Sequence, residues 1–302
     1  MRTEVRQRWV FRLSLRRRLD GLSPVRGRVV HRLLHRDGRP VAIRVVQLAK
    51  DRVLFGARAD DRELAEWGIE RMRLALGIDQ DLRPFYERFR SDPLIGPALR
   101  ANPGLRVSGR PDPFEALAWS VCEQLIEYER AAAIERRLVA AIGRHCPETG
   151  LRDAPCAQVI ADQAPARLAS FGLSEARALT LSRAAREVAS GRVELAAGDH
   201  ESGWQRLRRI RGIGAWTLQT LALTGQGRLD QLPAGDVGYL KLVGRLCAGG
   251  DPYARATVEE VERFFAPYKP WCGLAGLHAL SGAGGGARLR LTARNSASWP
   301  KE

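Results

Sequence analysis

RLRRIRGIGAWTLQTLALTGQGRLDQLPAGDVGYLKLVGR, residues 206–245, is the stretch of this chain that decides its fold. Apolar residues on either side of Gly212-Ile213-Gly214 recur at helical spacing, which predicts two helices joined by a short turn. Glycine allows close approach to the backbone, and the second helix begins with free N–H groups at the positive end of its dipole. The stretch therefore predicts a helical hairpin that can bind an anion such as a DNA phosphate.

An acidic residue follows the hairpin. Asp236, in the segment PAGDVG (233–238), lies 24 positions after Gly212 and precedes another apolar helical pattern. An aspartate in this position could simply cap the next helix. Its carboxylate could also stabilise the positive charge that develops on a sugar when an N-glycosidic bond breaks, and it could orient or deprotonate a water. The two roles can coexist.

GIGAWT (212–217) and PAGDVG resemble the hairpin and the catalytic loop of the helix-hairpin-helix DNA glycosylase superfamily, most of all those of bacterial 3-methyladenine DNA glycosylase II. FGLSEARA (171–178) is similar to a helix start in that family. The resemblance runs from the nineties to the 280s. It implies a mainly α fold, in which a glycosylase core of two helical halves carries a small N-terminal α+β domain with an antiparallel sheet.

The resemblance implies an enzyme of base excision DNA repair. It would flip a nucleotide with an N-alkylated purine out of duplex DNA into a cleft between the helical halves, and hydrolyse the bond between base and sugar. Such a base is already cationic, so one carboxylate suffices. Asp236 takes the catalytic position, whereas Asp230 lies outside the PAGDVG pattern. A glycosylase for a deaminated base and a non-catalytic hairpin protein that binds DNA are the alternatives.

Lysine is absent between residues 51 and 240. Bifunctional members of the superfamily carry a Schiff-base lysine just after the hairpin glycines, where this chain has Ala215 and Trp216. An amine nucleophile is therefore unavailable at the hairpin. We expect a monofunctional enzyme that uses water and leaves an abasic site.

The resemblance also assigns the residues beside the extruded nucleotide. Trp216 and Trp271 match aromatic positions of the base pocket, where an indole face attracts a cationic purine. Gln124 and Leu125 match a pair next to the flipped base, with Leu125 as the wedge that fills the gap. Each tryptophan could instead belong to the core, and Leu125 could lie on the core face of the helix that begins near Asp112.

Two positions depart from the family pattern. Val237 and Thr220 stand where the type member of the family has tyrosines. We therefore expect a less aromatic pocket, whose range of substrates the sequence leaves open.

The backbone of the hairpin carries two further expectations. A DNA phosphate would bind N–H groups near Gly212, Gly214, Trp216 and Thr217. Members of the superfamily often hold a monovalent cation on carbonyls at the end of the first hairpin helix, which here are those of Arg208, Ile210 and Ile213. No cofactor is expected to be required. The alternative is a helix corner without a ligand, and the arginines that cluster before the glycines argue against it.

Composition favours a DNA partner. The chain has 49 Lys and Arg against 34 Asp and Glu, a net charge of +15, which is typical of proteins that bind polyanions. No apolar run is long enough for a membrane span, and the N-terminus lacks the apolar centre of a signal peptide. Five cysteines without paired spacing argue against zinc or iron–sulfur sites and suit a reducing compartment. We expect a cytoplasmic, nucleoid-associated bacterial protein that acts as a monomer.

The order of elements predicts three parts. Residues 1–80 form the N-terminal α+β domain, with a helix from Arg62 to about Leu76 that Asp60 or Asp61 caps. Residues 81–281 form the helical core, and residues 282–302 a flexible C-terminal tail that begins with a glycine-rich linker. The strands of the first part are expected at 9–15, 29–34, 41–46 and 52–55.

Overall fold

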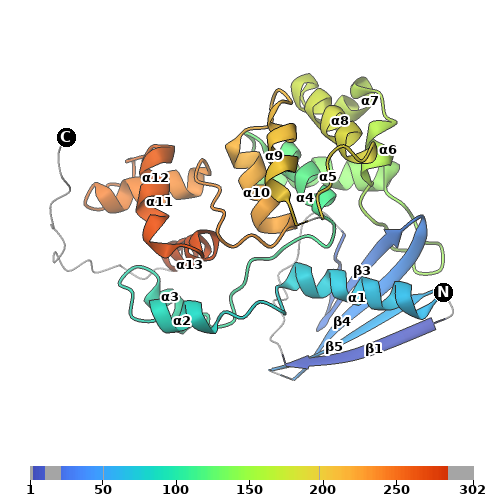
Figure 1. Cartoon of the computed structure of the whole chain (residues 1–302), viewed down its shortest axis with the longest axis horizontal. Helices are drawn as coiled ribbons and strands as arrows, with labels where there is room; N and C mark the ends of the chain where they lie inside the picture. The colour runs from blue at the N-terminus through green and yellow to red at the C-terminus, as the bar shows by residue number, and fades with distance from the viewer. Residues whose placement is uncertain (1–2, 11–21, 50, 197, 285–302) are drawn as a thin grey trace. The chain divides into compact units, whose positions relative to one another are not determined.

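The computed structural model describes residues 3–10, 22–49, 51–196 and 198–284 (Figure 1). The chain divides into two compact units. Unit 1 comprises Met1–Gln80 and Arg106–Pro233, and unit 2 comprises Asp81–Leu105 and Ala234–Glu302. In the part of the chain that is described, none of the helices is long and apolar enough to cross a bilayer.

Unit 1 begins with a five-stranded antiparallel sheet in the order β1-β5-β4-β3-β2, so the predicted sheet is confirmed. Asp37 and Gly38 both have positive φ, 52° and 77°, as a two-residue turn between twisted strands requires. The predicted start of the first strand is wrong: β1 runs over residues 3–10, and half-buried and exposed residues alternate from 3 to 9. The predicted residues 11–15 lie outside the described residues. The strands are β1 (Thr3–Val10), β2 (Val25–Arg26), β3 (Val29–Arg36), β4 (Arg39–Ala49) and β5 (Arg52–Ala59).

Helix α1 (Arg62–Leu76) covers one face of this sheet (Figure 1). Of the two expected caps, Asp61 makes the bond, because its carboxylate accepts from the Leu64 N–H at 2.8 Å. Gly68 brings the helix close to the sheet, since a Cβ there would lie 2.5 Å from Val41. The buried apolar face of the helix thus forms one core with the sheet.

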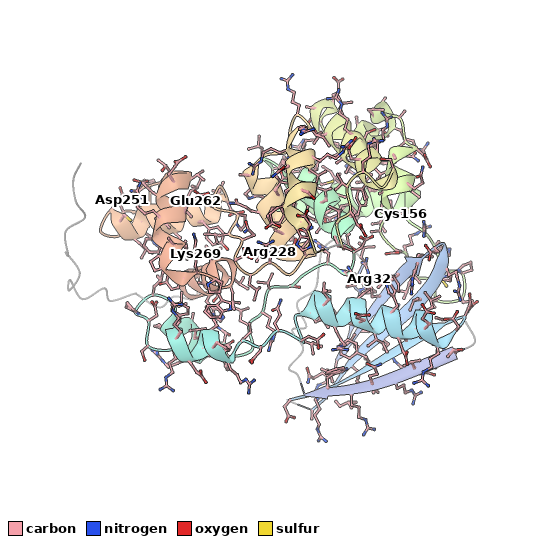
Figure 2. The ribbon with its side chains drawn as sticks, in the orientation of Figure 1. Arg32, Cys156, Arg228, Asp251, Glu262 and Lys269 are labelled. Atoms are coloured by element: carbon pink, nitrogen blue, oxygen red, sulfur yellow. The ribbon has the colours of Figure 1, made fainter. Side chains whose placement is uncertain are left out.

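A buried ion network around Arg32, which Figure 2 labels, joins the sheet to the central helices of unit 1. Arg32 of β3, only 1% exposed, donates to Glu115 at 2.5 Å and to Asp153 at 3.1 Å. His35 contacts the other Asp153 oxygen at 3.0 Å, and Arg110 donates to Glu115 at 3.3 Å. The N-terminal domain is therefore held to the helices by charges that water does not screen.

The central helices of unit 1 surround α4 (Pro113–Glu123), which packs against α5, α8 and α10. Asp112 caps α4 by accepting from the Phe114 N–H at 2.9 Å. Glu115, three positions later, does not reach back to cap the helix, because its carboxylate pairs with Arg32 and Arg110. The other helices are α5 (Tyr128–Ile142), α6 (Ala157–Ala161), α7 (Pro165–Ser170), α8 (Glu175–Ala189), α9 (His200–Arg208) and α10 (Ala215–Gly225).

Unit 2 is helical throughout its described part. The linker expected from Gly282 is wrong as far as Gly284, because α13 continues through these residues. Gly282 lies against α3, where a Cβ would come within 3.4 Å of Ala98, so the glycine serves helix packing. Residues 285–302, expected as a flexible tail, lie outside the described residues. The elements are α2 (Arg83–Phe89), α3 (Gly96–Ala101), α11 (Val237–Cys247), α12 (Val258–Phe265), the 3-10 helix η1 (Ala266–Tyr268) and α13 (Cys272–Gly284).

Candidate active site

Helices α9 and α10 form the predicted hairpin (Figure 1). Leu207 and Ile213 are buried and fix the turn to the core of unit 1. The chain reverses at Gly212, whose φ of 96° is strained for residues with a side chain. Gly214 is the N-cap of α10 and is exposed, with no atom within 4 Å of where its Cβ would be. The start of α10 is thus open to a ligand at the positive end of the helix dipole.

Helix α8 holds the hairpin turn from the side. The Thr180 hydroxyl donates to the carbonyl of Arg211 at 2.9 Å. A Cβ at Gly212 would lie 2.4 Å from that hydroxyl oxygen. Both the backbone conformation and the contact with Thr180 therefore require glycine at position 212.

Replacing Gly212 by alanine is expected to destabilise the protein by about 1–3 kcal/mol, because the new methyl group meets Thr180 and the left-handed backbone disfavours a side chain. Urea unfolding measures the loss. Gly214→Ala is the matched control, since φ is −103° there and space is free; its cost should stay below about 1 kcal/mol. Equal losses in the two variants would contradict this account of the turn.

Gln124, expected beside the flipped base, connects the end of α4 to the hairpin. Its side-chain nitrogen donates to the Gly212 carbonyl at 2.7 Å and to the Thr217 hydroxyl at 2.9 Å. Arg177, at the start of α8, donates to the carbonyls of Cys122 at 2.8 Å and Gln124 at 3.5 Å. No local pattern in the sequence indicates this role of Arg177, because its partners lie more than 50 positions away. These bonds fix the segment after α4 against the hairpin.

Leu125 does not belong to the core, so the alternative of a core leucine is wrong. Helix α4 ends at Glu123, and Leu125 is fully exposed, with a relative accessibility of 104%. Its φ is 55°, in the left-handed region that leucine seldom occupies. Exposing a leucine forgoes about 1.5–3 kcal/mol of burial free energy. An apolar side chain held outward at this cost is what a wedge into stacked bases needs.

The arginines before the turn differ in their surroundings. Arg206 pairs with Glu187, which Arg192 also contacts at 2.8 Å. These two guanidinium groups lower the pKa of Glu187 to about 2. The three arginines that follow are exposed and precede the open start of α10 by three to six positions: Arg208, Arg209 and Arg211.

Asp236 lies in unit 2 as the N-cap of α11. Its Oδ1 accepts from the Gly238 N–H at 2.7 Å, so the capping role is observed. A Cβ at Gly238 would come within 3.0 Å of that oxygen, so the glycine makes room for the carboxylate. Tyr239 is buried, and burial together with the Asp236 charge raises the pKa of its hydroxyl well above the ordinary value. Val237 beside it is 59% exposed.

Asp230, in unit 1, is bound to another partner. Arg228 donates from Nε to one Asp230 oxygen and from a terminal nitrogen to the other, both at 2.9 Å. Gln231 donates to the same carboxylate at 2.8 Å. These hydrogen bonds lower the pKa of Asp230, and the bond from Arg228 contributes most. A carboxylate fixed in this way is a structural group, which leaves Asp236 as the candidate for catalysis.

The two candidate tryptophans are each half-buried. Trp216 is the second residue of α10, and Thr220 one turn later has a buried hydroxyl with no hydrogen-bond partner among the described residues. Trp271, in unit 2, lies with its ring centroid 6.0 Å from that of Phe85 and 6.3 Å from that of Phe89. Trp271 is thus partly a core residue.

One of the carbonyls proposed to bind a cation at the hairpin already accepts a hydrogen bond. The Ile210 carbonyl accepts from the Ile213 N–H at 3.0 Å and so closes the turn. The described residues contain no group of three or more His, Cys, Asp or Glu that could hold a metal. A cation at the hairpin would therefore depend on backbone oxygens, as the resemblance to the superfamily implies.

Comparison with known proteins gives consistent matches. Residues 1–112 match the family model of the AlkA N-terminal domain, and residues 118–267 that of the HhH-GPD superfamily base excision DNA repair protein. DNA-3-methyladenine glycosylase of Bacillus subtilis is 30% identical over 221 residues, which are 70% of this chain and 72% of that protein. DNA-3-methyladenine glycosylase 2 of Escherichia coli is 28% identical over 188 residues, 61% of this chain and 62% of that protein.

A solved structure matches over almost the whole chain. The 3-methyladenine DNA-glycosylase from Archaeoglobus fulgidus superposes with a TM-score of 0.77 at 21% identity, covering 91% of this chain and 97% of that one. At this identity the likeness shows the fold.

Proposed function

This chain belongs to the HhH-GPD superfamily of base excision DNA repair proteins, in the branch of the 3-methyladenine DNA glycosylases, and we propose that it hydrolyses the bond between an alkylated purine and deoxyribose in duplex DNA. The observation that carries the proposal is the Asp236 carboxylate at the head of α11, within the matched region that also contains the hairpin. The fold alone would not suffice, because related folds host different functions.

The proposed reaction breaks the bond between C1′ and the base nitrogen. The bonding electrons leave with the base, which the alkyl group has already made cationic and therefore a good leaving group. The sugar becomes positively charged, and the Asp236 carboxylate stabilises that charge. Water then adds its oxygen to C1′ and loses a proton, which Asp236 can accept. The products are a free base and an abasic site.

We propose that the enzyme lacks lyase activity. A lyase of this superfamily forms a Schiff base through a lysine of the hairpin, and Ala215 and Trp216 stand there in this chain. Water is then the nucleophile, and the DNA strand stays intact after base release. Borohydride, which reduces a Schiff base to a stable amine, should trap no covalent complex between protein and DNA.

The remaining site residues receive proposed roles. The hairpin would hold a DNA phosphate through N–H groups near Gly212, Gly214, Trp216 and Thr217, and Leu125 would fill the gap in the duplex. Gln124 would position the neighbouring wedge residue by its hydrogen bonds to the hairpin. Trp216 and Trp271 would attract a cationic purine. A monovalent cation on the carbonyls of Arg208, Ile210 and Ile213 and a monomeric state complete the proposal.

The test uses the purified full chain and duplex DNA treated with a methylating agent. Release of 3-methyladenine into solution, with abasic sites left in unbroken strands, is the expected result. Strand breaks that appear without heat or alkali would contradict the proposal that the enzyme lacks lyase activity. Release from hypoxanthine-containing DNA alone would indicate a glycosylase for deaminated bases, and salt-sensitive DNA binding without any base release would indicate a non-catalytic protein.

Replacing Leu125 by alanine is expected to slow base release from paired duplex about tenfold, because the shortened side chain no longer stabilises the unstacked state. Protein stability should change by less than about 0.5 kcal/mol, because the side chain is fully exposed. Single-turnover release rates and urea unfolding measure the two effects.

The matched control is Leu179→Ala, which shortens another exposed leucine, on α8. It should leave the release rate unchanged. A Leu125→Ala variant that releases base as fast as this control would contradict the wedge role.

A further inference from the structure

The outward face of the N-terminal sheet is a basic surface that the proposed reaction does not use. Helix α1 and the inward residues, such as Val5, Ile43 and Phe55, form the core on the other face. Because side chains alternate along a strand, the residues between these lie on the outward face. The exposed arginines at outward positions are Arg6 and Arg8 of β1, Arg26 of β2, Arg44 of β4, and Arg52 and Arg58 of β5, which we call the sheet-face arginines.

Negative charge is scarce on this face. Among described residues at outward positions of the five strands, Glu4 is the only carboxylate, 2.9 Å from Arg6 and 3.6 Å from Arg58. The hydrogen bond from Arg6 and the nearby arginines lower the pKa of Glu4. Burial, and then the charges of Arg26 and Arg44, lower the pKa of His31. The whole N-terminal part follows the same trend, since residues 1–80 contain 19 Lys and Arg against 10 Asp and Glu.

The strand register leaves a hollow among these arginines. Gly56 pairs with Arg44 on one side and with Arg6 on the other, so a residue without a side chain separates two guanidinium groups. A Cβ at Gly56 would lie 3.9 Å from the Glu4 carboxylate, so the missing side chain leaves open space. The hollow measures about 240 Å³. Its lining includes Ala42 and Gly56 with Arg26, His31, Arg44 and Arg58, together with Glu4 and, from outside the sheet, Thr149 and Leu151.

We propose that this face binds the phosphate backbone of DNA, with one phosphate group seated in the hollow over Gly56. Guanidinium groups bind phosphate oxygens through two parallel N–H donors, and a row of them on a rigid sheet is complementary in charge to a polyanion. The described outward positions hold no Phe, Tyr or Trp on which a base could stack. The interaction is therefore independent of base sequence and adds to the one at the hairpin.

The experiment measures the affinity of the full chain for undamaged duplex DNA over a range of salt concentrations. Arg26, Arg44 and Arg58 are replaced together by glutamine. The slope of log K against log salt should fall by about 0.9 for each phosphate that the variant no longer neutralises. A second variant, Gly56→Val, fills the hollow without changing the net charge, and it should also weaken binding. Because the DNA carries no lesion, the result does not depend on whether the protein releases a base.

The matched control replaces three exposed arginines of other elements, Arg62, Arg167 and Arg263, by glutamine and so removes the same charge. For this control the slope of log K against log salt should stay at the wild-type value. A fall as large as that of the sheet-face variant would show that DNA binding depends only on the total charge. Thermal unfolding checks that each variant is folded, and Gly56→Val still tests the proposal if the triple variant is not. If the triple glutamine variant lost binding to phosphatidylglycerol vesicles but kept the wild-type salt dependence of DNA binding, the face would be assigned to a membrane and the proposal would be overturned.

Discussion

Replacing Asp236 by asparagine is expected to slow base release from methylated duplex DNA by roughly 10²- to 10³-fold. The substitution removes the negative charge that stabilises the sugar cation, and it removes the group that can accept a proton from water. Asparagine still offers a side-chain oxygen to the Gly238 N–H, and it is as good an N-cap as aspartate. The protein should therefore fold normally and bind DNA. Single-turnover assays with excess enzyme measure the chemical step directly.

Asp230→Asn is the matched control for this substitution. Asp230 lies six positions before Asp236, but Arg228 occupies both of its carboxylate oxygens. Its loss should reduce stability slightly and leave base release near the wild-type rate. If Asp236→Asn released bases at the wild-type rate, Asp236 would be a capping residue only, and the catalytic assignment would be wrong even within the right family.

Replacing Arg32 by alanine is expected to destabilise unit 1 by about 3–5 kcal/mol. Arg32 is 1% exposed and contacts Glu115 and Asp153, so its removal leaves two buried carboxylates without their main counterion. The guanidinium charge offsets the desolvation of both carboxylates, and after its removal the 1% exposed side chain of Glu115 keeps the longer contact with Arg110, at 3.3 Å. Urea unfolding followed by circular dichroism measures the change in the free energy of unfolding.

Arg36→Ala provides the matched control on the same strand. Arg36 pairs with Glu63 at 3.1 Å, but the two side chains are 42% and 82% exposed. Solvent screens such a pair, so the loss should lie between 0 and about 1 kcal/mol. If the two variants lost the same stability, the buried network would not be what holds the sheet to the central helices.

Local signals in the sequence were sufficient for the two hairpin helices and for the helix that follows Asp236. Gly212, Asp236 and the apolar spacing around them act within one or two helical turns, so their consequences can be derived from neighbouring residues. The same holds for Asp61, which caps α1 as its position predicts. The glycine-rich start of the expected tail shows the limit, because Gly282 belongs to α13 and lies against Ala98, which is far away in sequence.

The sequence by itself determined that this chain builds a glycine hairpin, an aspartate at the head of the next helix and the strands of an N-terminal sheet, because each depends on residues close together in the chain. Only the tertiary structure decided that Arg32 is buried, that Gln124 bonds to the hairpin and that Leu125 points outward at positive φ. An arginine in a strand is ordinarily exposed and a leucine after a helix ordinarily buried. The contact of Arg32 with Glu115, 83 positions away, helps to bury the arginine. The contact of Gln124 with Gly212, 88 positions away, helps to fix the segment that exposes Leu125.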